Sequence, residues 1–140
     1  SILVDATAPL KKANIKTMPY PGFPTDMQPQ MAVVMLRAEG TGKIDESIWE
    51  SRFKYTEELI RMGAEIAVAG KVATIKGGSR LLGAPVRACD LRAGAALVLA
   101  VQAAPALRTW TLILCGTSRS LTASRARSIR SSRKSRIYSL

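Results

Sequence analysis

The sequence predicts an α/β or α+β fold in which helices cover a sheet, and three observations support this class. Apolar residues recur at helical spacing in three segments, residues 25–38, 53–62 and 91–104. Two alternating runs, residues 65–69 and 72–76, flank Gly70-Lys71 as strands flank a tight hairpin turn. The hydrophobic content of 47% over 140 residues is sufficient for one ordinary core, so we expect one domain or part of one.

The first helix is expected to begin at Thr25. Residues 25–28 read Thr-Asp-Met-Gln, which has the form of a capping box with Thr25 as N-cap and Gln28 at N3. Gly40-Thr41-Gly42 is expected to end this helix. Its predicted apolar face consists of Met31, Val34, Met35 and Ala38. Three prolines before Thr25 make the preceding segment run extended or turn.

The middle of the chain alternates short strands with helices. A strand is predicted at residues 43–46, and a second helix follows that Gly63 stops. The apolar face of that helix consists of Phe53, Leu59, Ile60 and Met62. Residues 81–89 indicate a further strand, and Asp90 then caps a third helix whose Ala, Leu and Val content predicts burial on most sides. One more strand is indicated at residues 110–114, and no internal repeat is convincing.

Composition excludes several kinds of site. The chain has no histidine, which removes the commonest general base and every Ser-His or Cys-His nucleophile arrangement. Cys89 and Cys115 are too few, in segments too apolar, to indicate a disulfide framework or a zinc site. Acid–base chemistry must therefore fall to carboxylates, Lys, Tyr or Cys, and we expect no metal.

The net charge of +11 is unevenly distributed. All 10 acidic residues and 13 of the 21 basic residues lie before Pro105, whereas the other 8 basic residues follow without an acidic neighbour. Beyond Cys115 this basic tail, residues 105–140, is also rich in serine and almost lacks an apolar pattern, so we expect it to be disordered or joined out of frame. A non-enzymatic basic module that binds nucleic acid remains an alternative based on the tail alone, although the tail lacks interleaved aromatic residues.

The chain's start and its longest uncharged stretch indicate a cytoplasmic protein. The first residues contain neither an initiator Met nor a basic segment followed by an apolar one, so the start looks internal to a longer protein. The longest uncharged stretch, residues 93–107, is shorter than the roughly 18 apolar residues of a membrane span. We therefore expect neither a signal peptide nor a membrane partner.

Three short segments could carry chemistry. Asp26 follows a rigid proline-bounded turn at a helix start, where N–H groups and the helix dipole favour an ionised, oriented carboxylate. Trp49 and Arg52 are three residues apart and would share a helix face, which suits a ligand with a planar ring and an anionic group. Asp90 and Arg92 bracket another helix start. On physical grounds alone, simpler interpretations stay open: a first-turn acid, a surface Arg stacked on Trp, and a cap with a local ion pair.

Six peptides along the chain form a set. The most specific is Pro-Gly-Phe-Pro-Thr-Asp-Met-Gln at residues 21–28. The others are Ala-Glu-Gly-Thr-Gly at 38–42, Glu-Ser-Arg-Phe at 50–53, Glu-Leu-Ile-Arg-Met-Gly-Ala at 58–64, Leu-Gly-Ala-Pro-Val at 82–86 and Asp-Leu-Arg-Ala at 90–93. In order, spacing and wording they resemble one enzyme family, UDP-N-acetylglucosamine 1-carboxyvinyltransferase. The resemblance covers residues 2–104 and corresponds to part of the family's C-terminal domain, so residues 1–104 and 105–140 form separate segments.

The resemblance implies a fold, a reaction and partners. The fold is an inside-out α/β barrel built from repeated sheet-and-helix units, of which this chain holds part, facing a second, N-terminal domain across a cleft. The reaction transfers the enolpyruvyl group of phosphoenolpyruvate to the 3-hydroxyl of UDP-N-acetylglucosamine, through a tetrahedral intermediate and with loss of phosphate. This step begins peptidoglycan precursor synthesis, and the resemblance implies no metal or organic cofactor.

The resemblance also assigns roles to residues. Asp26 matches the carboxylate that accepts the sugar hydroxyl proton. Arg52 and Arg92 match arginines near the enolpyruvyl and phosphate groups, and Asp90 matches a second motif acid, so these four residues are the predicted catalytic set. The predicted substrate-binding set consists of Thr25, Asp26, Ile48 and Trp49. We therefore expect Asp26 to lie near both arginines.

Departures from the family pattern limit what the chain can do. The likeness stops at residues 102–105, where a later Arg-containing phosphate motif never appears, and we interpret the junction as a frameshift. The residues of the other domain are also absent, and the isolated chain is therefore expected to be inactive. The related 3-phosphoshikimate 1-carboxyvinyltransferase stays an alternative, although the peptide at residues 21–26 and Arg52-Phe53 favour the UDP-sugar enzyme.

Overall fold

The computed structural model describes residues 3, 5, 7–88 and 90–103, together with the backbone of residues 109–114 and 120–124. Its helical elements are the 3₁₀ turn η1 (Thr25–Met27) and the helices α1 (Gln28–Arg37), α2 (Tyr55–Arg61) and α3 (Leu91–Ala103). Its strands are β1 (Asn14–Lys16), β2 (Thr41–Asp45), β3 (Glu65–Ala69), β4 (Val72–Lys76), β5 (Pro85–Ala88), β6 (Thr109–Leu114) and β7 (Ser120–Ser124). The mixture confirms the predicted α/β class.

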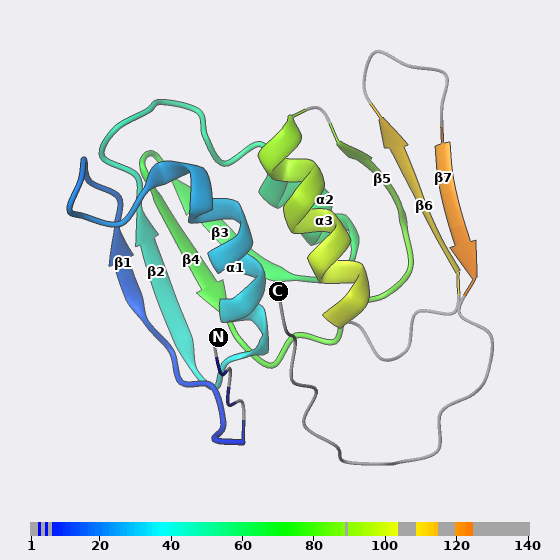
Figure 1. The fold of residues 1–140 in the computed structure, drawn as a ribbon, viewed down its shortest axis with the longest axis horizontal. Helices are drawn as coiled ribbons and strands as arrows, with labels where there is room; N and C mark the ends of the chain where they lie inside the picture. Colours follow the sequence, from blue (N-terminus) through cyan, green and yellow to red (C-terminus); the bar gives the residue numbers. More distant parts are fainter. Residues whose placement is uncertain are drawn as a thin grey trace.

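The two sheets repeat one topology along the chain. In the first, β1 and β2 are parallel with α1 between them in sequence, and β4 and β3 follow antiparallel in the order β1-β2-β4-β3. In the second, β5 and β6 are parallel with α3 between them, and β7 follows antiparallel. The equivalent helices α1 and α3 pack side by side, as Figure 1 shows. The structure thus contains a repeat of topology that the residue pattern alone does not reveal.

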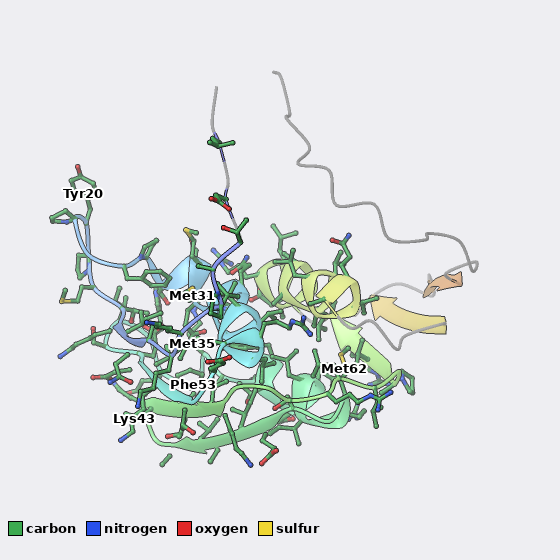
Figure 2. All side chains as sticks on the ribbon, turned by 90° about the horizontal axis from the view of Figure 1, so that it is seen from below. Tyr20, Met31, Met35, Lys43, Phe53 and Met62 are labelled. Atoms are coloured by element: carbon green, nitrogen blue, oxygen red, sulfur yellow. The ribbon has the colours of Figure 1, made fainter. Side chains whose placement is uncertain are left out.

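The core lies between the first sheet and the helices. Its largest fully buried apolar side chains are Leu36, Ile44, Leu59, Met62, Ile75 and Leu97. In β2 and β4, alternate residues face this core, as expected for strands with one covered face. Figure 2 shows Met31 and Met35 on α1 within the body of the molecule, whereas Tyr20 projects from the distant tip of the loop before η1. Tyr20 is accordingly 97% exposed.

Several local predictions are confirmed. Strands β3 and β4 have the predicted bounds, and Gly70 in their turn has φ +58°. Gly63 follows α2 with φ +93°, in the left-handed region that favours glycine after a helix. The predicted strand at residues 110–114 corresponds to β6. Each of these features depends on residues close together in the sequence.

The predicted capping box is wrong. Residues 25–27 form η1 instead, and α1 begins at Gln28 after Met27, which makes no side-chain cap hydrogen bond. The Thr25 hydroxyl donates to the carboxylate of Glu46 rather than capping the helix. Gln28 is fully buried, and its amide has no hydrogen-bond partner among the described residues. The helix also ends at Arg37, three residues before Gly40.

Parts of the predicted helix faces and one strand boundary are also wrong. Val34 is 40% exposed, because α1 buries only the faces that meet the sheet and α3. Ile60 in α2 is 45% exposed. Helix α2 begins at Tyr55, so Phe53 of the predicted apolar face lies before the helix. Helix α3 is buried along one side only and leaves Leu91 and Leu99 exposed. Strand β5 begins at Pro85, so residues 81–84 of the predicted strand lie outside it.

Some predictions fall on residues outside the described part. These include Cys89, residues 104 and 105 of the proposed frameshift junction at 102–105, and the basic residues after 124. Strand β7 lies in a stretch for which the sequence predicted no element. Within the described residues, no helix combines the length and apolar character that crossing a bilayer would require.

Gly77 provides a direct test of how closely α1 approaches the end of β4. A Cβ atom on Gly77 would overlap the carbonyl oxygen of Ala38 and lie 2.8 Å from its carbonyl carbon. Because both are backbone atoms, we expect Gly77→Ala to lower the free energy of unfolding by about 2–3 kcal/mol.

Urea denaturation measures this change, with Gly78→Ala as the matched control. Gly78 has φ +77° but no atom within 4 Å of an added Cβ, so its substitution should cost only about 1 kcal/mol, from backbone strain. Equal losses for the two variants would contradict the close approach.

Candidate active site

Three segments that are distant in the sequence meet at one end of the molecule. Asp26 lies in η1, directly before α1, and Asp90 and Arg92 lie at the start of α3. Arg52 lies in the loop that joins β2 to α2. Because α1 and α3 are packed together and begin at the same end, the upper end in Figure 1, these polar residues converge there.

Asp26 forms ion pairs with both predicted arginines. Its Oδ1 lies 2.5 Å from Nε of Arg92 and 3.5 Å from a terminal guanidinium nitrogen of Arg52. Arg92 also reaches Oδ1 of Asp90 at 3.5 Å and so joins the two carboxylates. The Asp26 side chain is 57% exposed, whereas that of Arg52 is 23% exposed. The expected proximity of Asp26 to two guanidinium groups is confirmed, in a cluster still open to solvent.

The cluster keeps its acid ionised. The hydrogen bond from Arg92 holds the pKa of Asp26 below its ordinary value, with slight burial opposing and the positive charges of Arg92 and Arg52 assisting. The same hydrogen bond raises the pKa of Arg92 further above its ordinary value. The site therefore contains an ionised carboxylate that pairs with two permanent cations.

Trp49 and Arg52 stack on each other without forming a helix, so the predicted shared helix face is wrong. Ser51 between them has φ +56°, which no helix accommodates. The loop nevertheless places the Arg52 guanidinium carbon 5.7 Å from the centre of the Trp49 ring, in cation–π range. Trp49 and Ile48 are 56% and 37% exposed. An apolar surface thus borders the guanidinium group and is free for contact.

Glu46 is a site residue that sequence reasoning missed. It is 1% exposed and directly follows β2, which ends at Asp45. Its Oε2 accepts the Thr25 hydroxyl at 2.7 Å, and its Oε1 accepts the Thr17 hydroxyl at 2.7 Å. Oε1 also accepts the backbone N–H groups of Ile48 and Trp49 at 3.0 and 3.2 Å. A buried carboxylate therefore lies beneath two of the segments that form the cluster.

A signal for Glu46 was present in the strand pattern. Gly42, Ile44 and Glu46 alternate along one face, and all three are buried. An acid in phase with a core residue such as Ile44 predicts a buried carboxylate, which needs several donors. Thr25, predicted to bind substrate, donates a hydrogen bond from its hydroxyl to this carboxylate.

The hydrogen bonds of Glu46 predict a pH-dependent stability. Burial alone would raise the pKa of Glu46, but the bonds from Thr17, Thr25, Ile48 and Trp49 outweigh it and leave the pKa below its ordinary value. A carboxyl group with a depressed folded-state pKa stabilises the fold above its unfolded-state pKa, and this contribution is lost as the pH falls through the folded value. Glu46→Gln should therefore destabilise the fold by about 1–3 kcal/mol at pH 7.

Denaturant unfolding between pH 7 and pH 3 tests the sign. The difference between Glu46→Gln and the parent should shrink below the ordinary carboxyl pKa, because the parent then loses the same charge. The control is Glu39→Gln, at the exposed surface, which should follow the parent at every pH. A difference for Glu46→Gln that does not depend on pH would contradict the assignment.

A cavity of about 670 Å³ adjoins the cluster. Arg52 and Asp90 line it together with charged residues of α2 and β5, among them Glu57, Glu58 and Arg87. This volume lies within the range of small-molecule sites. Arg52 and Asp90 are therefore accessible from a hollow large enough for a substrate.

Comparison with known proteins shows the family of the chain. A family model described as EPSP synthase (3-phosphoshikimate 1-carboxyvinyltransferase) matches residues 1–111. A Desulfofundulus thermocisternus protein named UDP-N-acetylglucosamine 1-carboxyvinyltransferase is 58% identical over 71% of this chain and 41% of its own length. A Symbiobacterium thermophilum protein named UDP-N-acetylglucosamine 1-carboxyvinyltransferase 3 is 56% identical over 67% of this chain and 22% of its own length. The chain thus spans less than half the length of these curated relatives.

Solved structures show the same fold. The enolpyruvyl transferase NikO from Streptomyces tendae has a TM-score of 0.66 and 34% identity, covering 79% of this chain and 24% of that protein. An EPSP synthase from Acinetobacter baumannii has a TM-score of 0.58 at 15% identity, covering 80% of this chain and 25% of that one, which supports the fold alone. Because the family model matches 111 of the 140 residues, this chain belongs to the EPSP synthase family of enolpyruvyl transferases.

Proposed function

We propose that the full-length enzyme containing this chain transfers the enolpyruvyl group of phosphoenolpyruvate to the 3-hydroxyl of UDP-N-acetylglucosamine and releases phosphate. The observation that carries the proposal is the contact of Asp26 with both Arg52 and Arg92 in a member of this family. The proposal includes a cytoplasmic location and a role at the start of peptidoglycan precursor synthesis. The N-terminal domain of the same enzyme would complete the cleft.

Asp26 is proposed to accept the proton of the sugar hydroxyl as the hydroxyl oxygen bonds to C2 of phosphoenolpyruvate. C3 of the donor takes up a proton in this step and loses one again when the bond from C2 to the phosphate oxygen breaks. A carboxylate held by two cations is a weak base, and phosphoenolpyruvate changes that balance, because its phosphate and carboxylate groups compete for the guanidinium groups of Arg52 and Arg92. Binding of the donor therefore raises the pKa of Asp26 toward its ordinary value. The base gains strength when both substrates are in place.

The other residues bind and stabilise charge in this proposal. Arg52 and Arg92 would bind the negative phosphate and carboxylate groups of the donor and stabilise the phosphate as it leaves the tetrahedral intermediate. Asp90 would help to hold Arg92, because it contacts a terminal guanidinium nitrogen at 3.5 Å while Asp26 contacts Nε. Ile48 and Trp49 offer the exposed apolar surface that a nucleotide sugar can cover. Thr25 contributes indirectly, because its hydrogen bond to Glu46 holds the backbone next to Asp26 in place.

A coupled assay of phosphate release from the full-length enzyme tests the proposal. Turnover is expected with phosphoenolpyruvate and UDP-N-acetylglucosamine, and none with shikimate 3-phosphate as acceptor. Sequence supports this preference, because the relatives named for the UDP-sugar reaction are 56–58% identical, against 15% for the EPSP synthase structure. Turnover with shikimate 3-phosphate alone would overturn it.

The isolated chain forms the second arm of the assay. Half of a two-domain cleft neither surrounds the donor nor excludes water. We therefore expect no phosphate release from the isolated chain, and clear turnover would contradict the need for the other domain.

A further inference from the structure

We propose that Glu46 is a positioning residue, which holds Asp26 in place through the Thr25 hydroxyl while it fixes the loop that carries Trp49 and Arg52. The inference rests on the proposed function, because it concerns the placing of the proposed base. Glu46 itself is 1% exposed and does not contact Asp26, Arg52 or Arg92 through any hydrogen bond in the described residues. Its effect on them must pass through the groups that it binds.

The two oxygens of Glu46 serve different segments. Oε2 binds the Thr25 hydroxyl, and Thr25 directly precedes Asp26. Oε1 binds the backbone N–H groups of Ile48 and Trp49, which begin the loop leading to Arg52. One carboxylate therefore sets the distance between the segment of the base and the segment of one guanidinium group.

The carboxylate is itself fixed to the sheet. The backbone N–H of Glu46 donates to the carbonyl of Lys71 at 2.8 Å, which ties the residue to the turn before β4. The Thr17 hydroxyl donates to Oε1 and accepts the N–H of Ser47, so the end of β1 also braces it. Hydrogen bonds to an ionised acceptor are roughly twice as strong as neutral ones. Glu46 thus transmits the position of a rigid sheet to the first turn before α1.

Thr25 and Thr17 form a matched pair for a test. Both hydroxyls donate to Glu46 at 2.7 Å, one to each oxygen, but only Thr25 is next to Asp26. Thr25→Val in the full-length enzyme should lower kcat, measured per folded molecule, by about 10- to 100-fold, because small misplacements of reacting groups are costly. The KM for UDP-N-acetylglucosamine should change less than about threefold, since the Trp49 loop keeps its own bonds to Oε1.

Rescue and control variants separate positioning from folding. Thr25→Ser keeps a hydroxyl and should restore kcat to within about threefold of the parent. Thr17→Val removes one donor to Oε1 but keeps the bonds of Glu46 to Thr25, Ile48 and Trp49, so it should shift the unfolding midpoint while kcat stays within about threefold. A kcat loss of equal size in Thr17→Val and Thr25→Val would overturn the proposal, as would a Thr25→Val enzyme with the parental kcat.

A readout without substrate keeps this inference separate from the proposed function. In an NMR titration of the Asp26 carboxyl carbon, Thr25→Val should move the pKa of Asp26 up toward its ordinary value, because the carboxylate loosens from Arg92, and Thr17→Val should leave it in place. A parent enzyme that shows no turnover would refute the proposed function, yet this titration would still test the role of Glu46. An unchanged Asp26 titration in Thr25→Val would overturn that role.

Discussion

Replacing Asp26 with asparagine in the full-length enzyme should lower kcat by about 10²–10⁴-fold, the usual contribution of a general base. Asparagine keeps the shape of the side chain and an oxygen for Arg92, but its amide cannot accept the sugar hydroxyl proton. Because Asp26 is largely exposed and not part of the core, the fold should be little affected. Steady-state phosphate release at saturating substrates measures the change.

Asp45→Asn is the matched control for Asp26→Asn. Asp45 lies in β2 next to Glu46, so its side chain points to the opposite face of the sheet. The control removes one carboxylate charge without touching the cluster, and it should leave kcat within about twofold. A loss of similar size in both variants, or a loss below about tenfold in Asp26→Asn, would exclude Asp26 as the base.

Local features of the fold could be predicted because their causes are local. The β3–β4 hairpin depends on alternation and a two-residue turn, and Gly63 depends on a positive φ after a helix. The faces of α1 could not be predicted in full, because α1 meets a sheet on one side and α3 on another, and α3 begins 54 residues after the end of α1 in sequence. The spacing of apolar residues in α1 does not indicate that a second helix packs against it.

Long-range contacts also explain the errors near the site. Thr25 matches a capping box, but a buried carboxylate 21 residues later accepts the hydrogen bond of its hydroxyl. The desolvated charge of Glu46 needs every available donor, and this demand exceeds the roughly 1 kcal/mol that a cap supplies. The Trp49–Arg52 segment resembles a helix turn by spacing. However, the N–H groups of Ile48 and Trp49 donate hydrogen bonds to the carboxylate of Glu46.

The residues of the candidate site were predicted by resemblance. The topology of the fold brings them close together in space. Asp26 is separated from Arg52 by 26 residues and from Arg92 by 66. No spacing rule joins residues so far apart, whereas two repeated strand–helix–strand units bring the starts of α1 and α3 to one end. Glu46 was missed because it binds Thr25 and the backbone of Ile48 and Trp49, next to the cluster, and none of the charged residues of the cluster itself.

Arg92→Gln should lower kcat/KM for phosphoenolpyruvate by about 10²–10³-fold, because a fixed cation aimed at developing negative charge is worth about 3–4 kcal/mol. The same change removes the main cause of the lowered pKa of Asp26. A carboxyl group with a depressed pKa stays ionised as the pH falls through its ordinary value, so loss of Arg92 must move its titration to higher pH. An NMR titration of the Asp26 carboxyl carbon should show this rise.

Lys76→Gln tests whether the effect is specific to the cluster. Lys76 also pairs with a carboxylate, that of Glu65 at 2.7 Å, and both side chains are 60% exposed. Loss of such a surface pair costs less than about 1 kcal/mol and should change neither kcat/KM nor the titration of Asp26. If Arg92→Gln behaved like Lys76→Gln, the contact between Arg92 and Asp26 would be a surface ion pair, and the donor site would have to lie elsewhere. If Arg92→Gln alone lowers kcat/KM and also raises the pKa of Asp26, then the Arg92 guanidinium group both binds the donor and holds the base.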